Sequence, residues 1–300
     1  MPEPRPLIFV GGTGRSGTHV VARILGKHAD LHNISNEVRF HVDPGGFPDL
    51  LAGETTPEEF VGRLRGRWWR GVALQRLSLR GLHRYVDREA LERACERFLE
   101  GFSADPDAAC RNLFLELLVP SMVKAGKPGL IEQSCDTIAQ APTLMRVFPE
   151  AKFIHVIRDG RDTAASRVAQ ARWLSKPRTI KQGLEWWEAR LRRNDIGKRE
   201  VPSEQFISFS LDELVETKRL ATFSRLRKFL ELERDQAMRG FFERKVSGRR
   251  GNFERWRRRL SPKRQQEIDR LYVEALERLE REQINGCRML RRVYDHRKGA

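Results

Sequence analysis

The opening of the chain constrains its fold more than any other stretch. Residues 7–10, Leu-Ile-Phe-Val, are apolar and favour a strand, and a helical pattern begins after Gly17. Between them lies a loop of glycines, hydroxyl side chains and one arginine, Gly11-Gly-Thr-Gly-Arg-Ser-Gly17. A strand, a glycine-rich loop and a helix in this order direct backbone N–H groups and the positive end of the helix at a phosphate-like group. The sequence therefore predicts an anion-binding loop after the first strand.

This loop departs from the P-loop of nucleoside triphosphatases at one position. Gly12 and Gly17 occupy the two glycine positions of that pattern, but Thr18 stands where the pattern requires a lysine. The lysine of a P-loop reaches the terminal phosphates of the nucleotide. We therefore expect this loop to hold a phosphate-like group other than the γ-phosphate of ATP.

The composition narrows the class of protein. The chain has 300 residues, of which 39% are hydrophobic and 33% charged, and this fits an enzyme with a sizeable core and extensive solvated faces. No segment approaches the roughly 20 apolar residues that span a membrane. Residues 1–6 contain three prolines and Glu3, unlike a signal peptide, and the four cysteines lack metal-ligand spacing. We expect a cytoplasmic protein with free thiols.

The formal net charge of +16 first indicates a nucleic-acid partner. However, the arginines are spread through the chain, and neither a zinc-finger spacing nor a basic segment interleaved with aromatic residues is present. An enzyme that binds an anionic substrate also accounts for the charge. We therefore expect no nucleic-acid partner and keep a basic nucleic-acid-binding protein as an alternative.

Strand and helix patterns alternate along the chain. After residues 7–10, strands are expected at 130–131, 153–157 and 205–209, and helices at 87–102, from 105 onward, and at 159–170, 211–232 and 262–283, with 30–56 irregular. This alternation predicts an α/β fold, a P-loop-type three-layer αβα arrangement around a mainly parallel sheet. We expect one domain over residues 1–300 with a helical insertion at about 57–126. Ligands of such sheets bind where the strands end.

Two further motifs can reach the same anion. Arg158 ends a predicted strand and Ser166 lies two turns into the next helix, so a guanidinium and a hydroxyl can hold a phosphate from two sides. Downstream, Arg249-Arg250-Gly251 is followed by Trp256 and Arg257 and can clamp an anion with side chains and backbone. Taken alone, the first motif is equally compatible with an ordinary turn, and the second indicates no more than an ordinary basic loop.

Together and in this order, the three motifs resemble the sulfotransferases that use 3′-phosphoadenosine 5′-phosphosulfate (PAPS). In that family an Arg-Ser-Gly-Thr loop holds the 5′-phosphosulfate, an arginine and a serine bind the 3′-phosphate, and an Arg-Lys-Gly element closes over it. The resemblance covers residues 7 to about 260 and implies metal-independent transfer to a hydroxyl, with 3′-phosphoadenosine 5′-phosphate (PAP) as product. The donor-binding residues that it implies are Gly14, Arg15, Ser16, Gly17, Thr18, His19, Arg158, Ser166, Arg249, Arg250 and Gly251.

Residues 33–41 resemble the Glu-Glu-Thr-Arg region of tyrosylprotein sulfotransferases, where a glutamate takes the proton of the acceptor hydroxyl. The resemblance implies that Glu37 is the general base. It gives Arg39 the position of the neighbouring arginine, and we expect Arg39 and His41 to contact the acceptor. We expect Arg15 and His19 to take part in catalysis by stabilising charge. Alternatively, Glu37 is a surface residue paired with Arg39, or one of the two histidines is the base.

Two positions depart from the family pattern. Gln133 stands where the tyrosylprotein enzymes carry a lysine that stabilises the transition state, and Leu211 stands where relatives often carry a tyrosine. The acceptor is expected to be a small-molecule or peptide hydroxyl, and the sequence leaves its identity and the oligomeric state open. Besides nucleic-acid binding, a magnesium-dependent P-loop kinase remains an alternative. Candidate walls of an acceptor pocket are Trp68, Trp69, Trp173, Trp186 and Trp187.

Overall fold

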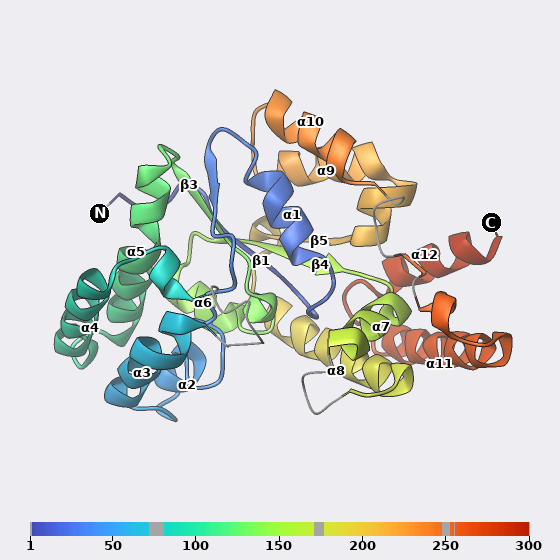
Figure 1. Ribbon diagram of the computed structural model, residues 1–300, viewed down its shortest axis with the longest axis horizontal. Coiled ribbons are helices and arrows are strands. Elements are labelled where there is room, and N and C mark those ends of the chain that lie inside the picture. Colours follow the sequence, from blue (N-terminus) through green and yellow to red (C-terminus); the bar gives the residue numbers. More distant parts are fainter. Residues whose placement is uncertain (1, 72–80, 171–176, 248–252, 255, 300) are drawn as a thin grey trace.

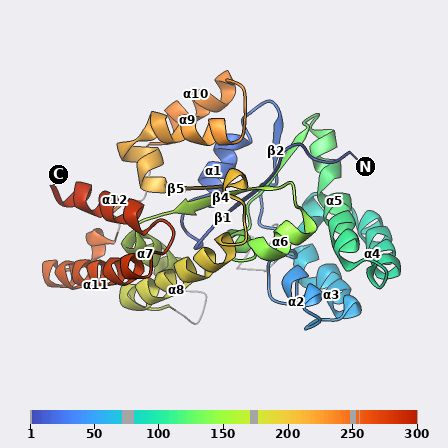
Figure 2. The same cartoon turned by 180° about the vertical axis from the view of Figure 1, so that it is seen from behind.

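A five-stranded sheet organises the computed structural model, which describes residues 2–299 except 72–80, 171–176, 248–252 and 255. Its strands are β1 (Leu7–Gly12), β2 (Leu31–Asn33), β3 (Gly129–Glu132), β4 (Lys152–Ile157) and β5 (Phe206–Ser210). All pair in parallel, in the order β2-β3-β1-β4-β5. Figures 1 and 2 show the sheet crossing the middle of the molecule, with α9 and α10 on one side and α7, α8 and α11 on the other. The predicted α/β layers are confirmed.

Side chains alternate along the strands and supply both faces of the core. In β1, Leu7 and Phe9 belong to one buried cluster, whereas Ile8 and Val10 belong to the cluster on the opposite face. Because both faces are covered, the strands read as continuous apolar runs. The first cluster is closed by helices between residues 47 and 147, and the second by α1 (Thr18–Leu25), α9 (Arg219–Phe229) and α10 (Gln236–Lys245).

The remaining helices of the described residues form two groups. One face of the sheet is covered by α2 (Phe47–Leu51), α3 (Pro57–Arg63), α4 (Arg88–Phe102), α5 (Pro106–Lys124) and α6 (Ala141–Val147). A third buried cluster is formed by α7 (Gly160–Gln170), α8 (Ile180–Lys198), α11 (Pro262–Arg281) and α12 (Cys287–Gly299). Asp87 caps α4, since its Oδ1 accepts a hydrogen bond of 2.7 Å from the N–H of Ala90. Among the helices of the described ranges, none is long and apolar enough to cross a membrane.

Most expected elements are present with shifted ends, and two expectations are corrected. Residues 30–56 are not wholly irregular, because β2 and α2 lie there. The single helix expected over 211–232 is divided into a π-helical turn (Glu213–Thr217) and α9, since Lys218 leaves the helical conformation with φ −135°. The helical insertion at 57–126 stays a prediction. Within it, α5 packs directly on the sheet through Phe114, whose ring centroid lies 5.8 Å from that of Phe9.

Candidate active site

A cavity of about 740 Å³ opens at the C-terminal edge of the sheet. Segments that follow all five strands line it: 13–20 after β1 (except Ser16), 35–39 after β2, 135–136 after β3, residues between 158 and 170 after β4, and Leu211 and Val215 after β5. Further walls come from residues outside these segments: Asp43, Arg67, Trp68, Gly71, Trp186, Arg190, Lys245, Val246, Ser247 and Phe253. Groups far apart in sequence therefore meet at one site.

The loop after β1 has backbone conformations that shape it as an anion-binding concavity. Gly14, Arg15 and Gly17 all have positive φ, at 79°, 59° and 102°. A Cβ on Gly17 would also lie 2.6 Å from a methyl carbon of Leu211, so glycine is required there on two grounds. The buried Ser16 hydroxyl has no hydrogen-bond partner in the described structure. Thr18 and His19 begin α1 and line the cavity, so the positive end of this helix faces it.

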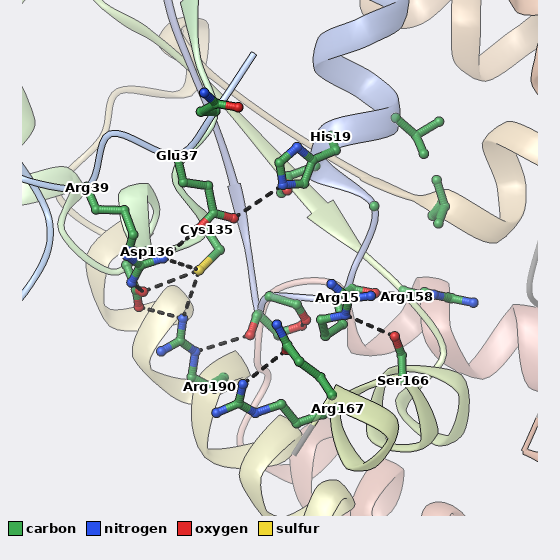
Figure 3. A pocket seen from close by; sticks show the side chains of 18 of the residues that line it. Arg15, His19, Glu37, Arg39, Cys135, Asp136, Arg158, Ser166, Arg167 and Arg190 are labelled. Carbon is green, nitrogen blue, oxygen red and sulfur yellow. Dashed lines mark hydrogen bonds and ion pairs between the residues drawn. The ribbon is translucent and has the colours of Figure 1, made fainter. Parts of the chain in front are cut away.

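Arg158 and Ser166 come from the segment after β4 and bond directly to the loop. The Nε of Arg15 donates to the Oγ of Ser166 over 3.0 Å, and the Nη1 of Arg158 donates to the carbonyl oxygen of Arg15 over 3.2 Å. The guanidinium of Arg158 also lies 5.4 Å from the ring centre of Phe253. Two sequence motifs that are 143 residues apart thus form one cationic surface (Figure 3).

Glu37 points into the cavity from the segment after β2 and faces His19 (Figure 3). Its Oε1 lies 3.5 Å from Nε2 of His19, and its Oε2 accepts a hydrogen bond of 2.6 Å from Nη1 of Arg39. Burial opposes ionisation of this carboxyl group, but the hydrogen bond from His19 and the charge of Arg39 outweigh it and lower the pKa of Glu37 to about 2. Glu37 is therefore a carboxylate at neutral pH.

Arg39 binds three carboxylates at once. Besides Glu37, its Nη2 lies 2.5 Å from Oδ1 of Asp43 and 3.1 Å from Oδ2 of Asp136. The residue has φ 63°, a conformation that costs a non-glycine residue about 1 kcal/mol. The guanidinium expected to contact an acceptor is thus already occupied by protein groups, and it orients Glu37.

His41 lies outside the cavity, which corrects the expectation that it contacts the acceptor. Its side chain is fully buried, its Nε2 lies 3.0 Å from Oε2 of Glu132, and its ring packs between Phe9, Phe40 and Phe114. A side chain with no exposed surface cannot touch a ligand in this conformation. Arg249, Arg250 and Gly251 lie outside the described residues, as does Trp173.

The two departures from the family pattern have different surroundings. Gln133 is buried and does not line the cavity, and its Nε2 donates to the carbonyl oxygens of Ile34 and Ser35 over 3.2 and 2.9 Å. Leu211 lines the cavity and packs on Gly17. Position 133 therefore supplies no polar group to the site.

Sequence reasoning missed several cavity residues. Cys135 and Asp136 follow β3, where the rule that ligands bind at strand ends could have found them. Burial raises the pKa of the Cys135 thiol to about 12, so the sulfur stays protonated. Arg167 and Arg190 come from helices and carried no sequence signal. Of the tryptophans proposed as walls, Trp68 and Trp186 line the cavity, whereas Trp187 is in the core.

Comparison with known proteins identifies a family. A sequence profile described as "Sulfotransferase family" matches residues 6–236. Protein-tyrosine sulfotransferase 1 of Danio rerio is 29% identical over 168 residues, which cover 55% of this chain and 36% of that protein. The Homo sapiens protein of the same name is also 29% identical, and 34% of its length is covered. The match thus spans about a third of the length of these curated relatives.

Solved structures agree on the fold. The sulfotransferase domain from the curacin biosynthetic pathway has a TM-score of 0.51 at 15% identity, covering 79% of this chain and 77% of that one. The sulfotransferase domain of the Synechococcus PCC 7002 olefin synthase also has a TM-score of 0.51, at 17% identity over 87% and 90% of the two chains. At these identities the likeness concerns the fold alone.

Proposed function

The chain belongs to the sulfotransferase family, and on this premise we propose that it transfers a sulfuryl group from PAPS to an acceptor hydroxyl. The observation that carries the proposal is the meeting of Gly14–His19, Arg158, Ser166 and Glu37 around one cavity. These residues offer a basic surface for a doubly phosphorylated donor and a carboxylate that can take the proton of the acceptor hydroxyl. Family membership does not favour the two alternatives, a P-loop kinase and a nucleic-acid-binding protein.

The donor is held by two groups of residues in this proposal. The backbone of Gly14 to His19 and the first turn of α1 bind the 5′-phosphosulfate, because such a turn presents N–H groups and a positive dipole end. Arg158 and Ser166 bind the 3′-phosphate. The unpartnered hydroxyl of buried Ser16 and the cationic surface around Arg15 fit this assignment. Arg249, Arg250 and Gly251 remain proposed contacts of the same phosphate.

Glu37 acts as the general base. The acceptor oxygen attacks sulfur in line, the new S–O bond forms, and the bridging bond breaks with its electron pair on the 5′-phosphate oxygen of PAP. Because the pKa of Glu37 is about 2, it is ionised but weakly basic. The proton therefore moves to it only as the attacking oxygen bonds to sulfur and its O–H becomes acidic. His19 and Arg39 orient this carboxylate, and His19 also lies close enough to the loop to bind the donor.

The acceptor is proposed to be a hydroxyl of a small molecule or of a peptide. The curated relatives are named for tyrosine in proteins, whereas the two solved domains above are named for a biosynthetic pathway and for an olefin synthase. The walls around Glu37 combine Trp68, Trp186 and several charged groups, and an acceptor with an aromatic ring next to its hydroxyl fits them.

Calorimetry with PAP and with 5′-AMP, both in EDTA, tests the proposal. One charge-assisted contact to the 3′-phosphate is worth about 2 kcal/mol, so PAP should bind roughly thirtyfold more tightly than 5′-AMP. Arg158→Gln should remove this preference. Glu37→Gln should keep PAP affinity and abolish turnover of PAPS. Equal affinity of the wild type for the two nucleotides would refute the assignment of the donor.

A further inference from the structure

Two arginines from different helices lie over the same indole ring in the cavity. The guanidinium carbon of Arg167 (α7) is 5.1 Å from the ring centre of Trp186, and that of Arg190 (α8) is 5.7 Å from it. Figure 3 shows both guanidinium groups next to one another, below Cys135. We call Arg167 and Arg190 the guanidinium pair.

Arg190 is fixed between the phosphate-binding loop and the catalytic carboxylate. Its Nε donates to the carbonyl oxygen of Thr13 over 3.2 Å, and its Nη2 lies 2.5 Å from Oδ1 of Asp136. The other oxygen of Asp136 binds Arg39, which holds Glu37. A continuous chain of charges thus runs from Glu37 to Arg190, and Arg190 is the member that touches the loop.

Arg167 carries a positive charge that no carboxylate of the described residues neutralises. Its Nη1 donates to Oε1 of Gln170 over 3.2 Å, and its buried Nε has no partner within the described structure. Burial and the nearby charge of Arg190 lower the pKa of this guanidinium, with Arg15 and Arg39 adding to the effect. Such an arrangement is unfavourable until an anion enters, because like charges repel and a buried donor is left unpaired.

The described lining of the cavity as a whole also carries more positive than negative side chains. Among its described lining residues, six arginines and Lys245 face only three carboxylates, and Arg39 binds all three of these. The proposed function places the 3′-phosphate on Arg158 and Ser166 and the 5′-phosphate on the loop. The group that then lies between the loop and Glu37 is the sulfuryl group, next to the guanidinium pair.

We infer that Arg167 and Arg190 bind the sulfuryl oxygens while the group passes from the donor to the acceptor. The inference rests on the proposed function and adds two catalytic residues to it. As the acceptor oxygen bonds to sulfur and the bridging S–O bond breaks, the proton goes to Glu37 and the electron pair goes to PAP. The guanidinium pair stabilises the negative oxygens on sulfur during this exchange, because its charge is already oriented there. Gln133, which is neutral and does not line the cavity, leaves this task to Arg167 of α7 and Arg190 of α8.

Binding and hydrolysis assays without an acceptor test the inference. Arg167→Gln and Arg190→Gln are compared with Arg193→Gln, an exposed position on α8 that lies outside the cavity lining. Calorimetry gives the affinities for PAP and for PAPS, and chromatography follows sulfate release from PAPS in water. Each cavity variant should bind PAP within about twofold of the wild type but release sulfate roughly 100-fold more slowly, since removal of one preorganised donor costs about this much. Arg193→Gln should match the wild type in all three.

Three outcomes would overturn the inference. Sulfate release at the wild-type rate in Arg167→Gln would show that this side chain does not act on sulfur. An equal loss of affinity for PAP and PAPS would assign the pair to a phosphate. A wild type that binds neither nucleotide would remove the proposed function, and the inference with it. Because Arg190 also binds Asp136, circular dichroism checks that the Arg190→Gln variant folds. Arg167 lacks a carboxylate partner in the described structure, so Arg167→Gln tests the inference without breaking an ion pair.

Discussion

Arg161 should be among the most sensitive positions for stability. It lies three residues after Arg158, in the first turn of α7, and has 1% of its surface exposed. Its Nη2 and Nε bond to the two oxygens of Asp159 at 2.5 and 3.1 Å, and its Nη1 lies 2.5 Å from Oδ1 of Asp269. The ring centres of Trp256, Tyr272 and Tyr294 lie 5.1, 4.6 and 5.1 Å from its guanidinium carbon.

The loss of stability expected when Arg161 is replaced follows from these contacts. Removing one partner of a buried ion pair costs about 3–5 kcal/mol, since the other charge stays buried. Each aromatic contact adds about 0.5–2 kcal/mol. Asp159 retains a weaker partner, Arg297, at 3.4 Å. We therefore expect Arg161→Met to lower the free energy of unfolding by at least about 4 kcal/mol, a large part of the about 5–15 kcal/mol typical of a folded protein.

Guanidinium chloride titrations followed by tryptophan fluorescence measure this change, because Trp256 is buried beside Arg161. Arg161→Lys keeps the charge without the planar fork and should lose less. Combining Arg161→Met with Asp159→Asn should cost less than the sum of the single changes, since the buried carboxylate of Asp159 is removed together with its partner. A loss below about 1 kcal/mol in Arg161→Met would refute this reasoning, as would strict additivity in the double variant.

Two further predictions concern pH and the loop. Burial and the charge of Asp159 raise the pKa of Asp162 from 3.8 to about 7, so the folded protein keeps a proton that the unfolded chain loses between these values. The free energy of unfolding should therefore fall as pH rises through this window, by at most about 1.4 kcal/mol per pH unit. Asp162→Asn should remove that fall in denaturant titrations at pH 4.5–7.5. A difference in unfolding free energy between wild type and variant that stays constant over this pH range would contradict the prediction. Gly17→Ala should lower stability by about 2 kcal/mol and weaken PAP binding in calorimetry, because φ is 102° and Leu211 is in contact. Gly53→Ala, with φ 77° and open space around it, is the control, and an equal loss in both would argue against the contact.

The sequence predicted the parts of the fold that leave a local pattern. Residues 153–157 form a run of mostly apolar side chains because β4 is buried on both faces, and this pattern is typical of parallel strands. β2 was missed because it has three residues, two of them polar, which is too short for a period to appear. The helix expected over 211–232 was divided by Lys218, whose conformation depends on its tertiary surroundings.

The candidate site was predictable only in part. The loop and Arg158 follow strands, so the topology rule brings them together. His41 was expected beside Glu37 from its closeness in sequence, but the chain turns at Arg39, where φ is 63°, and His41 enters the core. Arg167 and Arg190 face the cavity because of how α7 and α8 pack, and no local pattern encodes that orientation.

Because segments after all five strands line the cavity, no fragment of the sheet holds a whole binding site. PAP, whose proposed contacts come from the segments after β1 and β4, binds the native state and not a partly unfolded state that has lost either segment. At 100 times its dissociation constant it would add about 2.7 kcal/mol to the unfolding free energy of the entire domain. A rise in melting temperature with PAP would then indicate that the segments after β1 and β4, which are far apart in sequence, lose their structure together with the sheet.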